Sequence, residues 1–407
     1  MPKAPTTPLS CLFAINKPTG QVSMTLLNKL QPLFSNSALF KDPNAKQEEP
    51  KGKGKGRRAK WKQDRIKMGQ GGTLDPLADG VLVIGTNAAT KQLAGFLDCT
   101  KTYRAIGLVG CSTDSYDSDG KIVHEAKTWD QVTEEAVRDK LEMFRGEIEQ
   151  TPPVYSALKM DGKPLYEYAR SGLALPRPIP ARKVTISDIS LVSFTPGADR
   201  TDSYEFPKER LGDKEKLEME RLQKMVKEGR TEVPSEEEVV KEDEQKNEDN
   251  AAKETNGTSD LAATRPPIFE ISLTVSSGTY IRSVVHDLGV ALGTHCHVVK
   301  LTRTRQGGFS LAPNATTSTS KAASGSEQAD AVASVAGGAG EEQAAKAEEP
   351  EPLERGCVEW SLLEKAIAKM DEAKKGGQSA KDALDAERDA DGWLEWEREV
   401  LRNCKTV

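Results

Sequence analysis

Several short stretches of this chain are either continuously apolar or alternate apolar with polar residues, and both patterns are typical of β-strands. The continuous run VLVIG predicts a buried strand, and alternation in ARKVTISDISLVSF and PIFEISLTVSSGTYI predicts strands with one polar face. Together these patterns predict strands at 81–85, 102–110, 121–125, 181–194, 267–281 and 297–311.

Helical spacing of apolar residues separates these strands. It predicts helices at 87–97, 133–144 and 283–292, the second of them capped by Thr133 with a glutamate one turn later. Two more helices are expected near the C-terminus, within VEWSLLEKAIAKM and DGWLEWEREVLRNC. Strands with helices between them favour an α+β fold built on a mixed, mostly antiparallel sheet with flanking helices.

Three segments lack either pattern, and they explain a composition of only 36% hydrophobic and 5% aromatic residues in 407. A basic segment at 36–65 contains the string KGKGKGRRAKWK, in which alternating glycine and lysine cannot bury a core. The segment 197–265 is rich in acidic residues, and 313–355 is rich in Ala, Ser, Gly and Glu without an aromatic residue. We expect all three to be disordered, with a solvated helix left open for LGDKEKLEMERLQKMVKEG at 211–229.

Without these segments roughly 200 residues remain, which suits one domain. We therefore expect one folded domain at 12–312, interrupted by a basic insert at 36–65 and an acidic insert at 197–265. A low-complexity linker at 313–355 and a short helical tail at 356–407 would follow.

The same sequence argues against several classes of protein. No apolar run approaches the roughly 20 residues of a membrane-spanning helix, and the N-terminus lacks the pattern of a secretory signal. The six cysteines occur singly, without a CxxC pair, which fits a reducing compartment. The net charge of −6 gives no sign of a nucleic-acid partner, but it conceals nine Lys and Arg against one acid within 51–67.

Candidate chemistry is concentrated in GQGGTLDPLADGVLVIG, residues 69–85. Three glycines near its start allow positive φ angles and close approach of a ligand, and Pro76 stiffens the loop. Asp75 is thereby presented at the mouth of a sheet, where functional residues tend to lie. From these residues alone, an ordinary Asp-Pro turn is the favoured alternative.

The string GGTLDPLADGVLVIG resembles the signature of the TruB-type pseudouridine synthases. Five further strings occur in the order found in that family, and together they cover the folded remainder and none of the three segments set apart above. They are NKPTG (16–20), KTYRAIGLVGCSTDSYDSDG (101–120), PPVYSALKMDGKPLYEYAR (152–170), SSGTYIRSVVHDLG (276–289) and HVVKLTRTRQGGF (297–309).

This resemblance implies the pseudouridine synthase fold for 12–312 and an isomerisation of uridine in RNA. The N-glycosidic bond is cut, the base turns, and it rejoins the sugar through carbon, with no metal or cofactor. Asp75 would be the catalytic carboxylate, acting as a nucleophile or stabilising charge at the sugar. Tyr103 would stack on the flipped base, and Arg282 would pair with Asp75 and keep it ionised. On residue patterns alone, Tyr103 would be a half-buried strand tyrosine and Arg282 a surface arginine.

Further residues are assigned to the site by the same resemblance. Tyr280 would pack beside the pocket, and Leu301 would form an apolar wall for the base. Gln70 stands where many bacterial members have a histidine that helps to extrude the target base; glutamine can stack and hydrogen-bond but cannot titrate. The residues expected to contact RNA are Lys17, Gln70, Gly71, Gly72, Lys51, Lys53, Lys55, Arg57 and Arg58.

The string His295-Cys296-His297 invites a metal-binding interpretation. A zinc site needs four ligands, and only His124 and His286 remain elsewhere among the histidines. Neighbours on a strand also point to opposite faces. We therefore expect no metal site.

Within the family, the run YSALKMDGKPLYEYARSG resembles the stand-alone enzymes, and 356–407 resembles no PUA domain. The expected substrate is uridine 55 in the T-loop of tRNA, recognised by shape without a guide RNA; messenger RNA stays open as a further substrate. We expect a monomer located in the nucleus, with mitochondrial and cytoplasmic pools left open. The basic insert would bind phosphates or act as a nuclear-import signal, or be a solvated loop.

Two other functions fit the same sequence. A guide-dependent synthase would act on ribosomal or small nuclear RNA, and an RNA chaperone would fold tRNA in the same cleft. The presence of Asp75, Tyr103 and Arg282 together argues against loss of catalysis.

Overall fold

The computed structural model describes residues 7–41, 65–156, 158–171, 179, 181–217, 219, 265–311 and 354–407. The five insert residues expected to contact RNA, Lys51, Lys53, Lys55, Arg57 and Arg58, lie outside the described residues, as does most of the segments 197–265 and 313–355. None of the described helices has the length and apolar character needed to cross a membrane.

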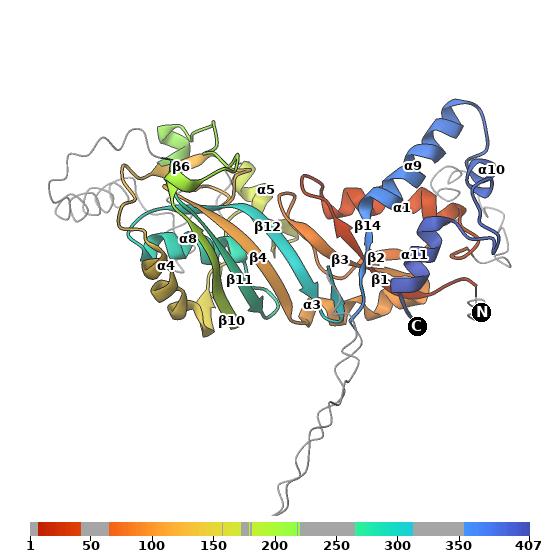
Figure 1. Ribbon diagram of the computed structural model, residues 1–407, viewed down its shortest axis with the longest axis horizontal. Coiled ribbons are helices and arrows are strands. Elements are labelled where there is room, and N and C mark those ends of the chain that lie inside the picture. The colour runs from red at the N-terminus through yellow and green to blue at the C-terminus, as the bar shows by residue number, and fades with distance from the viewer. Residues whose placement is uncertain are drawn as a thin grey trace, which may run out of the picture.

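One sheet of eleven strands organises the described part of the chain (Figure 1). Parallel pairing joins its first two strands and also its third and fourth, while the other pairs are antiparallel. This confirms the predicted α+β fold on a mixed, mostly antiparallel sheet. The order is β14 (Cys357–Glu359), β1 (Cys11–Lys17), β3 (Asp79–Thr86), β12 (Cys296–Gln306), β4 (Lys101–Val109), β11 (Ile268–Val275), β10 (Arg182–Thr195) and β7 (Gly146–Gln150). The short strands β2 (Met68–Gln70), β13 (Phe309–Ser310) and β15 (Lys405–Thr406) pair with β3, β12 and β1.

Helices flank the two ends of this sheet. Near β10, β11 and β12 lie α4 (Glu134–Leu141) and α8 (Ile281–Ala291); near β1 and β14 lie α1 (Ser23–Asn36), α9 (Trp360–Lys375) and α11 (Glu395–Asn403) (Figure 1). The remaining described elements are β5 (Cys111–Thr113), β6 (Ile122–Glu125), β8 (Lys159–Met160), β9 (Lys163–Pro164), α5 (Leu165–Arg170), α10 (Ala380–Asp385) and the 3-10 turns η1 (Asn87–Gln92), η2 (Glu142–Phe144) and η3 (Gly197–Asp199), with α3 (Leu93–Asp98) following η1.

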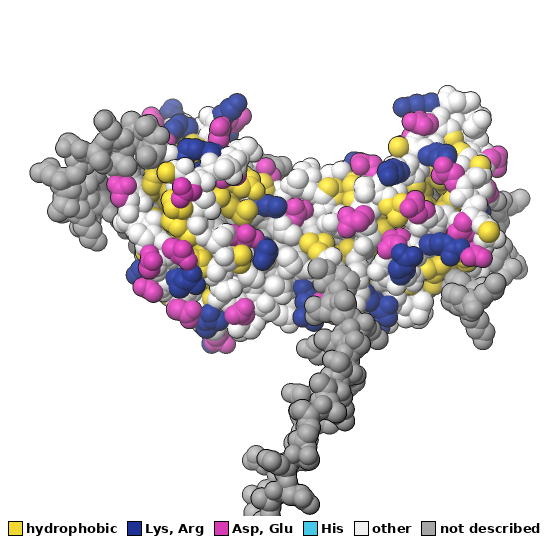
Figure 2. Space-filling model, viewed as in Figure 1, with side chains coloured by type: hydrophobic (Ala, Val, Ile, Leu, Met, Phe, Trp, Pro, Cys, Tyr) yellow, Lys and Arg dark blue, Asp and Glu magenta, His cyan; other side chains and the backbone are white. Residues whose placement is uncertain are grey.

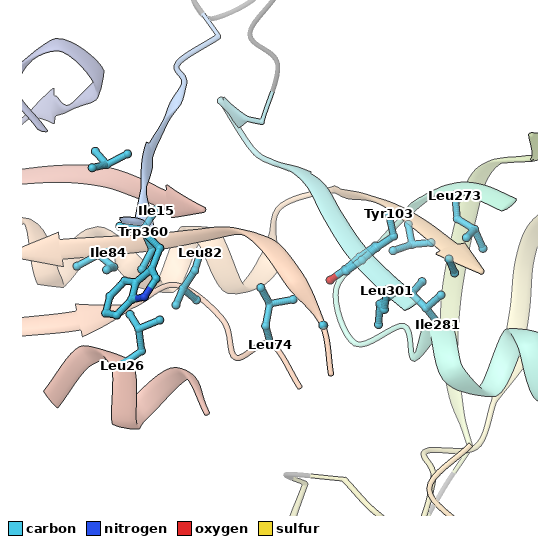
Figure 3. Close-up of a cluster of buried hydrophobic side chains, with 14 of the residues drawn as sticks. Ile15, Leu26, Leu74, Leu82, Ile84, Tyr103, Leu273, Ile281, Leu301 and Trp360 are labelled. Carbon is cyan, nitrogen blue, oxygen red and sulfur yellow. The ribbon is translucent and has the colours of Figure 1, made fainter. Parts of the chain in front are cut away.

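One cluster of buried apolar side chains extends from one end of the sheet to the other. Figure 3 shows members from β1, β3, α1 and α9 on one side and from β4, β11, β12 and α8 on the other, with Leu74 between them. Because Leu74 precedes Asp75 in the chain, burial of this leucine fixes the loop that carries the carboxylate.

Three predicted elements differ in their limits, and one of them, the strand expected at 297–311, is divided into β12 and β13 by a turn at Gly307 and Gly308. The helix expected at 87–97 is a 3-10 turn, η1, followed by the single α-helical turn of α3. The strand expected at 267–281 ends at Val275, because a turn with Gly278 at φ +81° follows and α8 begins at Ile281. The predicted cap of α4 is confirmed, since the Thr133 hydroxyl accepts from the Ala136 N–H at 3.2 Å.

The two helices expected within 356–407 are present as α9 and α11, and the same segment also adds strands to the sheet, which the sequence did not predict. Its first strand, β14, pairs with β1 in parallel. Its last strand, β15, pairs with the beginning of β1 in antiparallel orientation. Trp396 of α11 packs on Phe34 and Phe40 with ring centroids 4.8 and 6.2 Å away. The C-terminal residues therefore complete the sheet and core that begin at β1.

Gly80 sits where β3 meets β12, and its conformation demands glycine. Its φ is +101°, and an added Cβ would lie 2.3 Å from the Arg303 carbonyl oxygen. We expect Gly80→Ala to lower the free energy of unfolding by more than about 3 kcal/mol, because strain adds to a backbone clash. Gly146→Ala is the matched control, since Gly146 has a similar φ of +92° with open space around it; strain alone costs about 1 kcal/mol. Urea unfolding measures both, and equal losses would contradict the clash.

Candidate active site

Asp75 stands on the loop between β2 and β3, and the start of α1 holds this loop. The Ser23 hydroxyl donates to the Leu74 carbonyl at 3.0 Å, and the Leu74 N–H donates back to the same hydroxyl at 3.1 Å. The Thr19 hydroxyl donates to the Leu77 carbonyl at 2.6 Å. The backbone on both sides of Asp75 is therefore fixed before any substrate arrives.

Lys17 supports the same loop from β1. Its side chain is buried, and Nζ donates to the carbonyl oxygens of Ala78 at 2.5 Å, Pro18 at 2.9 Å and Pro76 at 3.3 Å. Burial lowers the pKa of Lys17 to about 8, although Asp79 and Asp75 act in the opposite direction. The predicted contact of Lys17 with RNA is thus corrected: all three donors are spent on backbone, and the ammonium group is not presented to a ligand.

We expect Lys17→Met to lower the free energy of unfolding by about 2–4 kcal/mol, because buried carbonyls lose a charged donor. The same change would displace the loop of Asp75. A reaction that depends on this carboxylate should then have a kcat lower by about 10–100-fold. Lys101→Met is the matched control: Lys101 is also buried and donates to the Leu97 and Cys99 carbonyls, not to a residue of this loop. Thermal unfolding and single-turnover rates should show similar destabilisation for both, with slow catalysis only for the first.

Arg282 brings the opposite charge to Asp75. It lies in the first turn of α8, and its Nε is 2.9 Å from Oδ2 of Asp75. The arginine side chain is 6% exposed and the aspartate side chain 40% exposed. The carboxylate therefore reaches the surface while the group that orients it stays buried, and the structure brings together the pair expected from sequence.

A second carboxylate, which sequence reasoning missed, also faces this guanidinium. Oδ2 of Asp117 is 3.6 Å from Nη1 of Arg282, and both side chains are buried. The remaining donors of Arg282 go to the Ser115 carbonyl at 2.5 Å and the Tyr155 carbonyl at 3.1 Å. In the sequence, Asp117 was one acid in an apparent turn, and nothing marked it from its acidic neighbours.

The pKa directions follow from this arrangement. Burial on its own would lower the pKa of Arg282, but Asp75 and Asp117 outweigh it and the pKa is raised. Burial raises the pKa of Asp117 to about 6, against the opposing effect of Arg282 and of the Ser115 hydroxyl. Arg282 is thus a permanent cation beside one exposed and one buried carboxyl group.

Tyr103 and Leu301 form the apolar side of the site. They come from the neighbouring strands β4 and β12, and both are buried. Figure 3 shows the Tyr103 ring near Leu301 and Ile281, with its hydroxyl directed towards Leu74. The polar end of the ring therefore faces the loop of Asp75. The ring can serve there as an aromatic platform beside the carboxylate.

Tyr280 precedes α8 and is half-buried, as expected for a residue beside the site. A side chain not found from sequence fixes its backbone: Oε1 of Gln150 accepts from the Tyr280 N–H at 2.7 Å, and Nε2 of Gln150 donates to the Tyr280 carbonyl at 3.1 Å. Gln150 is buried. It sets the start of the helix that carries Arg282.

The glycines ahead of Asp75 serve packing. Gly71 is buried, which corrects its predicted RNA contact, and an added Cβ would lie 2.7 Å from Cβ of Phe96. Gly72 has φ +133° and is half-buried. Gln70 is half-buried, and its Nε2 donates to the Thr73 hydroxyl at 3.1 Å.

Two buried polar side chains of β12 hold these glycines, and sequence reasoning missed both. Nη2 of Arg303 donates to the Gly72 carbonyl at 3.2 Å, and Nε2 of Gln306 donates to the Gly71 carbonyl at 2.6 Å. Both sit in the string TRTRQGG, whose pattern predicts only a closing strand. Their polarity within a buried strand was the signal available.

No group of three or more metal-binding side chains occurs in the described part of the chain. Cys296 and His297 are buried, and Nδ1 of His297 is 3.0 Å from the Cys111 carbonyl oxygen and 3.3 Å from the Cys111 sulfur. His295 stacks on His124 with ring centroids 5.1 Å apart. Burial lowers the pKa of His297 to about 4, so it stays neutral and packs as a core residue.

The arrangement can hold an ionised carboxylate next to an apolar surface and a phenol. Such a carboxylate can attack an electrophilic carbon or stabilise positive charge that develops at a sugar. The guanidinium orients the carboxylate through the ion pair, and the aromatic ring offers a face for a planar base. The chemistry therefore fits a reaction at a nucleoside.

Comparison with known proteins gives the family of this chain. Residues 58–205 match the TruB family pseudouridylate synthase N-terminal domain. The chain is 39% identical to tRNA pseudouridine synthase 4 of Schizosaccharomyces pombe, over 74% of this chain and 79% of that protein. It is 37% identical to tRNA pseudouridine synthase 4 of Saccharomyces cerevisiae, over 74% of this chain and 78% of that protein. It is also 37% identical to tRNA pseudouridine synthase B of Bordetella parapertussis, over 62% of this chain and 75% of that protein. With such identity over more than two thirds of these relatives, the chain belongs to the TruB family of pseudouridylate synthases.

Proposed function

We propose that this protein converts uridine 55 in the T-loop of tRNA to pseudouridine, without a guide RNA, and that Asp75 is the catalytic carboxylate. The observation that carries the proposal is the ion pair between Asp75 and Arg282, on a loop whose Leu74 lies in the direction of the Tyr103 hydroxyl (Figure 3). The names of the relatives, tRNA pseudouridine synthase 4 and B, support tRNA as the substrate. The described residues after 354 pair with β1 of the main sheet, which supports a stand-alone enzyme over a guide-dependent one.

The reaction we propose is balanced within the substrate. The bond between N1 of uracil and C1′ of ribose breaks, and a bond between C5 and C1′ forms. The proton leaves C5, and N1 ends protonated, so that no oxidant, reductant or cofactor is required. Asp75 would attack or stabilise the reacting carbon, Arg282 would hold the carboxylate in place, and Tyr103 would hold the base and exchange a proton.

The deciding experiment is to incubate the purified protein with an unmodified tRNA transcript and map pseudouridine at single-nucleotide resolution. We expect modification at position 55 alone, with no added RNA. A transcript with cytidine at position 55 is the matched control. Modification elsewhere, or only after addition of a guide RNA, would contradict the proposal; folding of tRNA without modification would favour the chaperone.

We also propose that the basic insert contributes phosphate contacts. On the face shown in Figure 2, Lys and Arg are interspersed with Asp and Glu rather than gathered in one patch. In the sequence, residues 51–67 carry a net charge of +8, the largest local excess of charge of either sign. A nuclear-import role, which would place the protein in the nucleus, uses the same charges.

Replacement of Lys51, Lys53, Lys55, Arg57 and Arg58 by glutamine should weaken tRNA binding. It should also flatten the dependence of log K on log salt concentration by about 0.7–0.9 for each phosphate that the protein no longer neutralises. Filter binding at several salt concentrations measures the slope. An unchanged slope would leave the import role, which a localisation assay of the same variant then tests.

A further inference from the structure

The buried partners of Arg282 lie on a different segment from its own helix. The Ser115 carbonyl and the Asp117 carboxylate belong to the turn between β5 and β6, whereas Arg282 projects from α8. The direction of the guanidinium towards Asp75 therefore depends on how this turn sits on α8. What fixes the turn is consequently part of how Asp75 is aimed.

One aromatic pair joins the turn to the helix. Tyr116, which lies between Ser115 and Asp117, stacks on His286 with ring centroids 4.0 Å apart and 15° between planes. His286 follows Arg282 by four residues on α8, so the two project from the same face one turn apart. The stack therefore joins the turn between β5 and β6 to α8, one helical turn from Arg282.

The backbone of Tyr116 is held in a costly conformation. Its φ is +63°, which a bulky side chain adopts only where the surrounding structure enforces it. Two further bonds fix the same point to β12, because the Val298 N–H donates to the Tyr116 carbonyl at 3.0 Å and the Ser118 N–H donates to the Val298 carbonyl at 2.9 Å. Such strain is characteristic of functional sites.

The carboxyl group of Asp117 is also set by this turn. The Ser115 hydroxyl donates to Oδ1 of Asp117 at 2.5 Å, and the Asp119 N–H donates to the same oxygen at 3.1 Å. Oδ2 is thereby left to face Arg282. A shift of the turn would move the two acceptors that it supplies to Arg282, the Ser115 carbonyl and the Asp117 carboxylate, at the same time.

We propose that Tyr116 and His286 are positioning residues, whose stacked rings lock the turn 114–119 onto α8 and so aim Arg282 at Asp75. The inference rests on the proposed catalytic role of Asp75. The rings act by shape and contact, so a phenylalanine at either position preserves the function and a residue without a ring does not. No proton transfer is assigned to His286.

The test uses four variants of the full chain. His286→Ala and Tyr116→Gly remove a ring, and glycine accepts the positive φ without strain; His286→Phe and Tyr116→Phe keep one. For the ring-less variants we expect kcat for pseudouridine formation to fall about 10–100-fold, as misplacement of a catalytic group does, with KM for tRNA within about twofold. The phenylalanine variants should stay within about threefold of the wild-type rate. The double variant Tyr116→Gly/His286→Ala should be no slower than the slower single one, because both changes break one contact.

Hydrogen exchange gives a readout that does not depend on activity. Amides of 113–121 should exchange faster in the ring-less variants and at the wild-type rate in the phenylalanine variants, while the core strand β4 stays protected. A wild-type protein that leaves tRNA unmodified would refute the proposed function, and the exchange measurement would still decide whether the stack holds the turn. A phenylalanine variant as slow as its ring-less counterpart, a raised KM with unchanged kcat, or unchanged exchange would overturn the proposal.

Discussion

Asp75→Asn is expected to lower pseudouridine formation in tRNA by at least about 10³-fold while tRNA affinity stays within about twofold. Asparagine has nearly the same shape and keeps the loop between β2 and β3 intact. It is neutral, so it neither attacks a carbon as a carboxylate does nor stabilises a developing cation. Single-turnover assays at saturating protein separate this loss of chemistry from a loss of binding.

Asp139→Asn is the matched control for that variant. Asp139 is exposed on α4, and neither ion pair of Arg282 involves it. Its rate should remain within about threefold of wild type, as a surface change away from the reacting atoms does. Thermal unfolding of both variants checks that the fold is kept. Substantial activity in Asp75→Asn would refute the catalytic assignment and leave Asp75 as a loop residue.

Arg282→Lys is expected to lower kcat by about 10²–10³-fold, although the positive charge is retained. The guanidinium serves Asp75, the Ser115 carbonyl, the Tyr155 carbonyl and Asp117 from three separate nitrogens. An ammonium group is a single point donor and cannot reach these acceptors together. Arg282→Ala should in addition lower the free energy of unfolding by about 3–5 kcal/mol, because Asp117 is left as a buried carboxylate without an opposite charge.

Arg104→Lys provides the matched control for the arginine. Arg104 pairs with Glu270 across β4 and β11 at 3.4 Å, but its side chain is 53% exposed. An exposed pair contributes little, so this change should leave both rate and stability nearly unchanged. Wild-type activity in Arg282→Lys would show that charge alone, rather than the fixed fork of donors, sustains the reaction.

Prediction from sequence succeeded where the information is local. Alternation in 181–194 and the continuous run at 81–85 correctly indicated strands, because side-chain period on a strand is fixed by backbone geometry. The cap at Thr133 was found for the same reason, since donor and acceptor lie within one turn. The pairing of Asp75 with Arg282, in contrast, was reached through resemblance to a family, because more than two hundred positions separate them.

Prediction failed where a residue's role depends on distant partners. The family resemblance assigns Lys17 to RNA contact, but its ammonium group is buried and donates to the backbone carbonyls of Pro18, Pro76 and Ala78. Asp117 looked like a turn residue, but α8 covers it with Arg282. The residues after 356 looked like an appended tail, but they supply strands to β1.

The sequence by itself therefore determined most of the longer strands and helices between 81 and 311, the resemblance to the family and the loop that carries Asp75. Only the tertiary structure decided which charges are buried, which side chains aim Arg282, and that the C-terminus closes the sheet begun at β1. The physical reason is that periodicity and capping act within a few residues along the chain. Burial, ion pairing and strand partnership are instead set by what other segments bring into contact, and no local pattern encodes that.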